Sequence, residues 1–374
     1  MKSRPSSRSI DDENLRKAAV QLQRRLLQWY QQNKRDLPWR LAWQQFGSPY
    51  HVWVSEIMLQ QTVIKAVIPA YERFMIRFPR IEDLAAASEE EVRLASRGLG
   101  YYRRFRMLHQ AAQKLVADHP DCDSSAKEFW PQDFRSWQEQ PGVGSYTAAA
   151  IASIAFHEAV PVVDGNVERV FCRLLDIREE PGQNYLKKAF FQLGLHVIAK
   201  SEPGNFNQAL MELGQRVCSK ASPQCSICPI KGHCLAFANK SQSLAPKTKT
   251  RAIATEMQGF LLIAKKRGRI GLSMRPSEAR FLGGHLGFVT AFKSEDGIIN
   301  WDGHKSANLS TKELGTTIGH IKHTITRFKL AMEVRIVEPK NAAGYEWLRP
   351  NEVEERLVSN LDRKAWQRYE QMLS

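Results

Sequence analysis

Apolar residues recur at helical spacing through the first two thirds of the chain and alternate with polar residues in the last third. Stretches such as 50–68 carry apolar side chains three and four positions apart, which is typical of helices. Short proline- and glycine-rich breaks separate these stretches. Residues 327–336 instead alternate apolar with charged side chains, the period of a half-buried strand. The pattern predicts an all-α domain over 12–238 and an α+β domain over 256–374, joined by a polar, proline-broken linker over 239–255.

Charge and composition limit the partners that this chain can have. The 374 residues carry a formal net charge of +15, and the excess is divided almost evenly between 1–240 and 241–374. Such a charge favours a polyanionic partner. No run of eighteen apolar residues occurs, and the start of the chain lacks the apolar core of a secretory signal. We therefore expect a monomeric cytoplasmic protein, nucleoid-associated if bacterial, with no membrane partner.

Four cysteines fall within the stretch 218–234, at spacing C-x6-C-x2-C-x5-C: Cys218, Cys225, Cys228 and Cys234. Disulfides are disfavoured in a reducing compartment. Structural zinc sites prefer two short C-x2-4-C knuckles separated by a longer span. Four thiolates on one segment suit a cuboidal [4Fe–4S] cluster better, although ferredoxin spacings differ from this one. The preference for the cluster therefore depends partly on the resemblance given below.

Two carboxyl groups and one glycine-rich turn stand out in the helical part. Glu56 lies among apolar neighbours, so its carboxyl group is either capped by a partner or kept partly protonated by burial. Asp164 precedes a glycine, where a simple turn is the alternative interpretation. Gly142 and Gly144 permit a tight turn before a predicted helix, whose N-terminus can bind a phosphate. An ordinary turn is the alternative for that pattern too.

Together these motifs resemble the MutY branch of the helix-hairpin-helix, endonuclease III-like DNA glycosylases. The resemblance covers roughly residues 20–370 and is most specific over 37–240. It implies a monofunctional adenine DNA glycosylase of base excision repair, acting on double-stranded DNA with adenine opposite 8-oxoguanine or guanine. The four cysteines would hold the [4Fe–4S] cluster, which would serve in DNA docking. The first domain is thereby identified as a member of the helix-hairpin-helix glycosylases.

The resemblance also implies roles for individual side chains. Glu56 would protonate adenine N7, and Asp164 would stabilise the sugar cation, oriented by Asn166. Tyr146 stands where bifunctional members carry a nucleophilic lysine, so strand cleavage is expected to be weak or absent. The remaining residues implied to contact DNA are the wedge residues Gln61 and Tyr101, the pocket residues Arg40, Leu59 and Gln208, and Gly142 and Gly144 of the hairpin. Arg103, Arg104 and Arg106 would either contact phosphates or form a solvated basic face.

The second domain resembles the MutT/Nudix-like domain with which MutY enzymes recognise 8-oxoguanine, but it lacks the Nudix catalytic box. Family members carry Phe-Ser-His in the recognition loop, where this chain has Ile325, Thr326 and Arg327. Thr326 keeps a hydroxyl group, whereas Ile325 cannot stack as phenylalanine does and Arg327 introduces a cation. We therefore expect the discrimination of 8-oxoguanine to be altered or reduced.

Other functions remain open from the sequence. A thymine or other mismatch glycosylase of the same fold also has tyrosine at the hairpin position, although the segment 55–62 argues against it. A non-catalytic DNA-binding protein with the same cluster and hairpin is disfavoured because both Glu56 and Asp164 are present. An electron carrier would not need the large basic helical body.

Overall fold

The computed structural model describes residues 17–248, 254–294, 299–302 and 314–373. Two compact units can be distinguished in this part of the chain, and each is described by itself. The first contains residues up to 87 and from 103 to 248, and the second contains 88–102 and the described residues from 254 onward. The predicted domain bounds include 12–16, 249–253 and 374, which lie outside the described residues. The predicted bounds themselves stay predictions.

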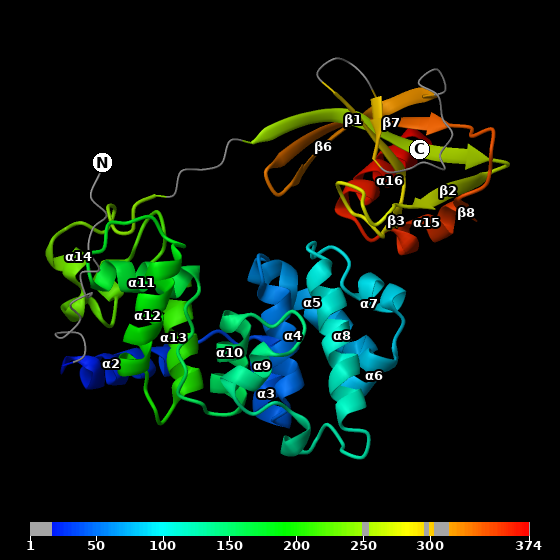
Figure 1. Ribbon diagram of the computed structural model, residues 1–374. Helices are drawn as coiled ribbons and strands as arrows, with labels where there is room; N and C mark the ends of the chain where they lie inside the picture. Colours follow the sequence, from blue (N-terminus) through cyan, green and yellow to red (C-terminus); the bar gives the residue numbers. More distant parts are fainter. Residues whose placement is uncertain (1–16, 249–253, 295–298, 303–313, 374) are drawn as a thin grey trace, which may run out of the picture. The chain divides into compact units, whose positions relative to one another are not determined.

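The first unit is helical, as the apolar pattern predicts (Figure 1). Its α-helices are α2 (Ala19–Asn33), α3 (Pro38–Phe46), α4 (Pro49–Leu59), α5 (Ile64–Arg77), α6 (Ile81–Ala86), α8 (Arg103–Asp118), α9 (Phe134–Gln138), α10 (Ser145–Ala155), α11 (Gly165–Leu174), α12 (Asn184–Val197), α13 (Pro203–Arg216) and α14 (Leu235–Ala238). Short 3-10 helices span Lys127–Phe129, Cys225–Ile227 and Lys231–His233. Among the described helices none is long and apolar enough to cross a membrane.

Helices α4 and α10 form the centre of this unit. Both are apolar on nearly all sides, and most of their residues are buried, which is the pattern of a core helix and not of a surface one. They pack against each other, and α13 packs against α10. The approach of α13 is close, because a Cβ at Gly204 would lie 2.7 Å from the Cα of Ile154. This packing brings the middle of α4, the start of α10 and one face of α13 together.

The second unit is built on an eight-stranded sheet with three helices. The strands are β1 (Thr255–Lys266), β2 (Arg269–Met274), β3 (Leu286–Gly287), β4 (Val289–Lys293), β5 (Ile299–Trp301), β6 (Thr316–Ile325), β7 (Phe328–Val337) and β8 (Tyr345–Leu348), and the helices are α7 (Glu89–Ala95), α15 (Pro350–Arg356) and α16 (Asn360–Leu373). The order β3-β2-β1-β4-β5 is antiparallel, β7 pairs with β1 in parallel, β6 pairs with β7, and β8 pairs with β2. The α+β class predicted for this part is confirmed.

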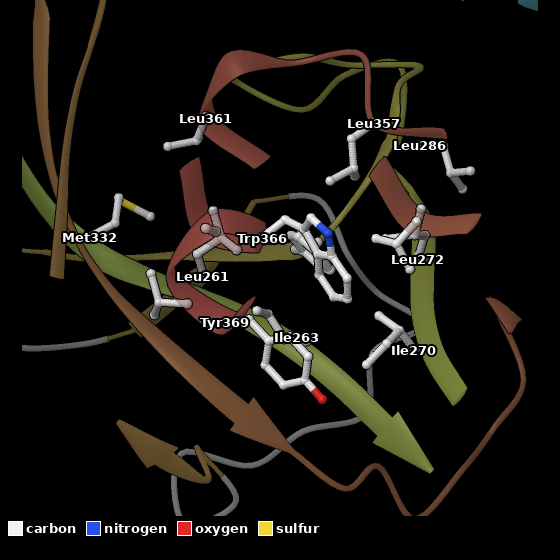
Figure 2. Packing of buried hydrophobic residues seen from close by; sticks show 14 of the residues in the cluster. Leu261, Ile263, Ile270, Leu272, Leu286, Met332, Leu357, Leu361, Trp366 and Tyr369 are labelled. Carbon is white, nitrogen blue, oxygen red and sulfur yellow. The ribbon is translucent and has the colours of Figure 1, made fainter. Parts of the chain in front are cut away.

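The core of the second unit lies between the sheet and helices α15 and α16. Trp366 and Tyr369 of α16 pack among Leu261 and Ile263 of β1 and further aliphatic side chains (Figure 2). The alternation read from residues 327–336 places Leu330, Met332 and Val334 in this core. A buried ion pair also joins sheet and helix.

That ion pair involves the arginine of the Arg-Pro sequence at 275–276. Arg275 is 1% exposed and binds Asp362 through two hydrogen bonds of 2.7 and 3.0 Å. The same carboxylate accepts from the backbone N–H of Phe288 and from the hydroxyl group of Ser359. A buried pair of this kind persists because further hydrogen bonds support the two charges. It therefore fixes α16 against the sheet.

Candidate active site

A cavity of about 680 Å³ opens in the first unit, between α3, α4, α10, α13 and the N-terminus of α11. Its size is suitable for a small organic ligand, and its lining mixes apolar side chains with many polar and charged ones. It brings together seven of the residues that the sequence analysis singled out: Arg40, Glu56, Leu59, Tyr146, Asp164, Asn166 and Gln208. Residues far apart in the sequence thus meet at one site.

Glu56 is the most unusual acid in this cavity. It lies on α4 and is only 6% exposed, as its apolar neighbours predict. The hydroxyl group of Tyr146, on the first turn of α10, donates to Glu56 Oε2 at 2.7 Å. Burial raises the pKa of Glu56 to about 7, the hydrogen bond from Tyr146 opposes this shift, and the charge of Asp164 adds to it. The site therefore contains a carboxylic acid that can give up a proton at neutral pH.

Asp164 is held as the N-cap of α11. Its Oδ1 accepts from the backbone N–H groups of Asn166 at 3.0 Å and Val167 at 2.7 Å. Its Oδ2 accepts from the side-chain amide of Asn166 at 2.7 Å. An aspartate at an N-cap is a common helix signal, and here it also places a carboxylate at the cavity wall.

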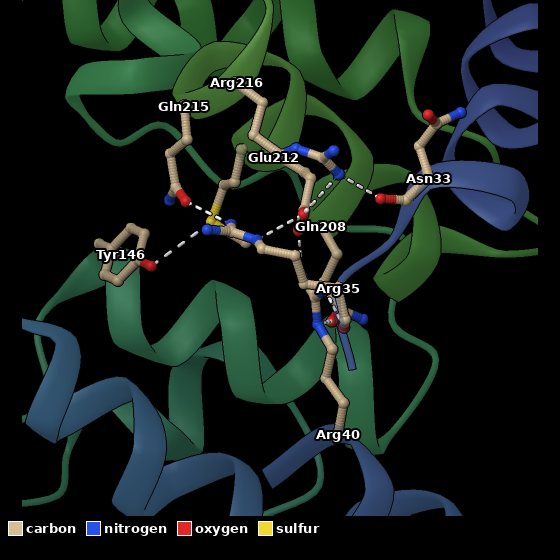
Figure 3. Close-up of polar contacts among 9 residues, drawn as sticks. Asn33, Arg35, Arg40, Tyr146, Gln208, Glu212, Gln215 and Arg216 are labelled. Carbon is tan, nitrogen blue, oxygen red and sulfur yellow. Dashed lines mark hydrogen bonds and ion pairs between the residues drawn. The ribbon is translucent and has the colours of Figure 1, made fainter. Parts of the chain in front are cut away.

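A set of charged side chains fixes the far wall of the cavity (Figure 3). Glu212 of α13 has a fully buried side chain, and it binds Arg35 at 2.6 Å and Arg40 at 2.9 Å. Burial alone would raise the pKa of Glu212, but the hydrogen bonds and charges of the two arginines lower it. Arg40 Nε also donates to Gln208 Oε1 at 2.9 Å. The two predicted pocket residues Arg40 and Gln208 therefore contact each other.

The glycine-rich turn joins α9 to α10 and forms a helical hairpin. Gly142 has a φ of 76°, and a Cβ there would lie 2.7 Å from Met107 Cβ, so only glycine fits. Gly144 has an ordinary φ of −83° and nothing within 4 Å of a Cβ position, so the expectation that it too is needed for the turn is wrong. Gly144 is instead the exposed N-cap of α10, where no side chain caps the first N–H groups.

The two predicted wedge residues share one backbone feature. Gln61 has a φ of 56° and is exposed, in the loop after α4. Tyr101, in the second unit, has a φ of 51° and is 46% exposed. Both are therefore presented on left-handed backbone, which residues other than glycine rarely adopt. Arg104 differs from its expected role, because it is buried and bonds to backbone carbonyl groups, so it can neither contact a phosphate nor join a solvated face.

The four clustered cysteines lie on the loop that follows α13 and are all partly buried. Burial and the neighbouring thiols of Cys218, Cys234 and Cys225 raise the pKa of Cys228 to about 12. Among the described residues, no group of three or more His, Cys, Asp or Glu side chains has a geometry ready to hold a metal ion. The thiols are therefore near one another without forming a closed ligand set.

Two arginines of α11 connect this loop with the cavity. Arg169 Nη2 donates to Asn166 Oδ1 at 2.9 Å, and its Nε donates to the carbonyl oxygen of Cys218 at 2.8 Å. One turn later, Arg173 is 3% exposed and its Nη1 lies 3.2 Å from Cys218 Sγ. The helix that begins at Asp164 is thus hydrogen-bonded to the start of the cysteine loop.

The residues Ile325, Thr326 and Arg327 form the tip of the β6–β7 hairpin in the second unit. Ile325 pairs with Phe328 across the turn and packs against the core. Thr326 has a φ of 52°, is exposed, and donates its hydroxyl proton to the carbonyl oxygen of Ile325 at 2.7 Å. Arg327 is exposed, with its guanidinium 5.2 Å from the ring of Phe328. Thr326 and Arg327 therefore face outward and Ile325 faces inward.

Comparison with known proteins agrees with this arrangement. Residues 54–193 match the model of the HhH-GPD superfamily of base excision DNA repair proteins. An adenine DNA glycosylase of Buchnera aphidicola subsp. Baizongia pistaciae is 31% identical over 252 residues, which cover 64% of this chain and 68% of that protein. The chain belongs to the adenine DNA glycosylase family. Its helical core is accordingly the endonuclease III-like core of this superfamily, as the sequence motifs predict.

Two further comparisons show how far the similarity of this chain to known proteins extends. The adenine DNA glycosylase of Mus musculus is 46% identical over 217 residues, or 57% of this chain, but the chain spans only 41% of the mouse protein. A solved structure of a thermostable thymine-DNA glycosylase covers 61% of this chain and 100% of its own, with a TM-score of 0.52 and 24% identity. The latter likeness concerns the fold alone.

Several residues of the cavity could not be recognised, or were not recognised, from the sequence. Glu212 and Arg35 were not singled out, although Glu212, like Glu56, stands in a helix among apolar neighbours, and that signal could have found it. The burial of Arg104 gives no signal, because a run of arginines has no helical pattern that distinguishes its buried member. Met211, whose sulfur lies 3.4 Å from the hydroxyl group of Tyr146, gives no signal in the sequence.

Proposed function

We propose that this chain is a monofunctional adenine DNA glycosylase of base excision repair. It would bind double-stranded DNA, turn a mispaired adenine out of the helix into the 680 Å³ cavity, and hydrolyse its N-glycosidic bond. The observation that carries this proposal is Glu56, a buried carboxylic acid with a pKa of about 7 in the same cavity as Asp164. The names of its relatives point to the same base and bond.

The geometry suggests how the acid would work. Tyr146 donates to Oε2 of Glu56, so the acid proton is left to Oε1. Transfer of that proton to adenine N7 turns a poor leaving group into a neutral base. Arg40, held by Glu212, and Gln208, which accepts from Arg40, would fix the flipped base beside the acid.

Asp164 would serve the second half of the reaction. Its carboxylate would stabilise the positive charge that develops on the deoxyribose as the base departs, as the second carboxylate does in glycoside hydrolysis. The three hydrogen bonds from Asn166 and Val167 would keep it in place without a change during the reaction. Tyr146 offers no amine, so a Schiff base with the sugar and strand cleavage through it are not expected.

Contacts to the DNA backbone would come from the helical hairpin. The N-terminus of α10 begins at the exposed Gly144 and has no side-chain cap, which suits a phosphate. Gln61 and Tyr101 would fill the space that the flipped base leaves, and Leu59 would line the base pocket. The spread of the positive charge over the chain supports this partner.

The cysteine loop would hold a [4Fe–4S] cluster through Cys218, Cys225, Cys228 and Cys234. The proximity of the four thiols and their soft sulfur donors support this ligand set. The cluster would cross-link the loop and present Lys220 and Lys231 to the DNA. Iron and sulfide analysis with an ultraviolet-visible spectrum of the purified protein tests this part of the proposal: four irons and four sulfides per chain are expected, and a zinc-only protein would contradict it.

The second unit would act as the MutT/Nudix-like recognition domain for the base opposite adenine. The outward-facing Thr326 and Arg327 would contact that base, and the replacement of histidine by a cation would weaken the preference for 8-oxoguanine over guanine. The protein would act as a monomer in the cytoplasm.

Single-turnover base release from defined duplexes tests the proposed function. Adenine release is expected from A:8-oxoG and A:G duplexes and not from A:T. Release of thymine from a T:G duplex without adenine release would favour a mismatch glycosylase of the same fold instead. Binding without release of any base would indicate a non-catalytic DNA-binding protein.

A further inference from the structure

The segment between α4 and α5 carries an exposed side chain on an unusual backbone. This segment, residues 60–63, is called the α4–α5 loop below. Gln61 is exposed and has a φ of 56°, in the left-handed region where a side chain with a Cβ is strained. Thr62 and Val63 line the cavity. The loop therefore lines the cavity with two of its side chains and exposes a third, that of Gln61, to solvent.

Arg104 of α8 forms hydrogen bonds to this loop. It is 7% exposed, and its Nη1 lies 3.0 Å from two carbonyl oxygens in the last turn of α4 and donates also to the carbonyl oxygen of Gln60. Its Nη2 donates to Thr62 Oγ1 at 2.9 Å. Carbonyl groups at a helix C-terminus lack the regular partners of the helix interior, so this guanidinium supplies hydrogen bonds to them. It thereby bonds to the residues on both sides of Gln61, to the backbone of Gln60 and to the side chain of Thr62.

A second contact joins the loop to α10, which carries Tyr146 of the active site. Gln60 Nε2 donates to the hydroxyl group of Thr147 at 3.2 Å, and Thr147 follows the tyrosine that binds Glu56. The loop thus has two anchors, one on α8 and one on α10. Of these two side-chain contacts, the one from α8 reaches beyond Gln61, to Thr62.

We propose that Arg104 is a positioning residue for base flipping that acts through Gln61. The inference rests on the proposed function, in which Gln61 fills the gap in the DNA stack. Without the guanidinium, the strained backbone at Gln61 relaxes to other conformations, and the loop must be ordered again whenever a base is flipped. Lysine keeps the charge but has no planar fork that can reach several acceptors at fixed angles. Arg104→Lys therefore loosens the loop without leaving an unfilled cavity.

The test compares two substrates that differ only in the state of the adenine. The first is the mispair that the parent protein cleaves fastest, where the base must be unstacked. The second presents the adenine opposite an abasic site, where unstacking is easier. With enzyme in excess, Arg104→Lys is expected to release adenine about 10- to 100-fold more slowly from the first substrate and less than about 3-fold more slowly from the second. Equal losses on both substrates would overturn the proposal, because they would indicate displacement of Glu56 instead.

A double-mutant cycle tests whether the effect passes through the loop. Gln61→Ala lowers the rate of adenine release, and this loss is measured as the change in the logarithm of the rate. In the Arg104→Lys background the loss is expected to be less than about half of that in the parent protein, because the side chain of Gln61 is already mispositioned there. Fully additive losses would contradict the proposal. Thr62→Val removes a single contact of the guanidinium and keeps the side-chain shape, so it should reproduce a smaller loss with the same substrate dependence. This variant remains informative if Arg104→Lys folds poorly.

Two controls separate this inference from the proposed function. Lys114→Met removes an exposed cation of the same helix that pairs with Asp118 and should change neither rate by more than about 2-fold. If the parent protein releases no adenine at all, the proposed function fails, and 2-aminopurine fluorescence at the mispair still measures unstacking without chemistry. Arg104→Lys is expected to lower that fluorescence change, and an unchanged signal would overturn the role of Arg104.

Discussion

At the scale of single residues, burial governs the acid–base chemistry of the cavity. Glu56 and Glu212 lie in the same cavity and are both buried, but their pKa values move in opposite directions. Glu212 forms ion pairs with Arg35, Arg40 and Arg216. The first two overcome the effect of burial on its pKa. Burial raises the pKa of Glu56 more than the hydrogen bond from Tyr146 and the charge of Arg40 lower it, so the carboxyl group keeps its proton up to neutral pH. The division into one anion and one acid follows from these partners.

The raised pKa of Glu56 predicts the pH dependence of activity. The acid is active in its protonated form, so the single-turnover rate of adenine release should fall as the pH rises through about 7. A rate profile between pH 5 and 9 measures this. A rate that stays constant up to pH 9 would show that Glu56 is not the proton donor.

The same shift predicts a pH dependence of stability. Between pH 4.5 and about 7, the folded protein keeps a proton on Glu56 that the unfolded chain releases. The free energy of unfolding therefore falls as the pH rises through this window, by up to about 3 kcal/mol from this group. Glu56→Gln lacks this term, so in urea unfolding its stability relative to the parent should increase from pH 5 to pH 8. A constant difference would contradict the pKa.

Tyr146 offers a complementary prediction. Its hydrogen bond lowers the pKa of Glu56, so Tyr146→Phe should raise that pKa further. The falling limb of the rate profile is then expected to move to higher pH, although the maximal rate can decrease because Oε2 loses its donor. A limb that moves to lower pH would contradict this account of the pair.

Some of the residue-scale chemistry could be predicted from the sequence. The apolar neighbours of Glu56 indicate its burial, because a helix that is apolar on all sides has no solvated face. The partners of Arg40 and the burial of Arg104 could not be predicted, because both depend on contacts between helices that are distant in the sequence. Such contacts are set by the angles at which helices pack, which periodicity does not contain.

At the scale of elements, the two glycines in the hairpin of α9 and α10 have different structural roles. Gly142 permits a left-handed turn against Met107, whereas Gly144 leaves the N-terminus of α10 open. The sequence predicts the turn, but it does not show which glycine is conformationally required, because that depends on the side chain packed against it.

Substitution by alanine distinguishes the two positions. Gly142→Ala must accommodate a φ of 76° and a contact of 2.7 Å with Met107 Cβ, so a loss of about 2–4 kcal/mol in unfolding free energy is expected. Gly144→Ala meets nothing within 4 Å and should change the stability by less than about 1 kcal/mol. Urea unfolding of the two variants beside the parent measures the difference. Equal losses would show that the turn does not need Gly142.

At the scale of the whole molecule, the division into two units differs from the division of the sequence pattern. Residues 88–102, with α7 and Tyr101, group with the sheet and not with the helices before and after them. Helical periodicity shows that α7 has an apolar face, but it cannot show which unit that face contacts. The α+β class of the second unit could be predicted because strand alternation is a local signal.

The hairpin tip of the second unit carries the prediction on the opposing base. The parent protein should release adenine from A:8-oxoG and A:G duplexes at rates that differ little, and Arg327→His should restore a preference for A:8-oxoG. Single-turnover rates from the two duplexes measure this. A strong preference already present in the parent would mean that Thr326 and Arg327 recognise the lesion by another geometry.

The most direct test of the central claim is adenine release by the Glu56→Gln variant. Under single-turnover conditions, with the duplex that the parent protein cleaves fastest, the amide keeps the size of the side chain but has no acid proton. A rate at least about 100-fold below that of the parent is expected, with a folded protein and DNA affinity retained. A variant that releases adenine as fast as the parent would contradict the assignment of Glu56 as the acid, and with it the mechanism proposed for this cavity.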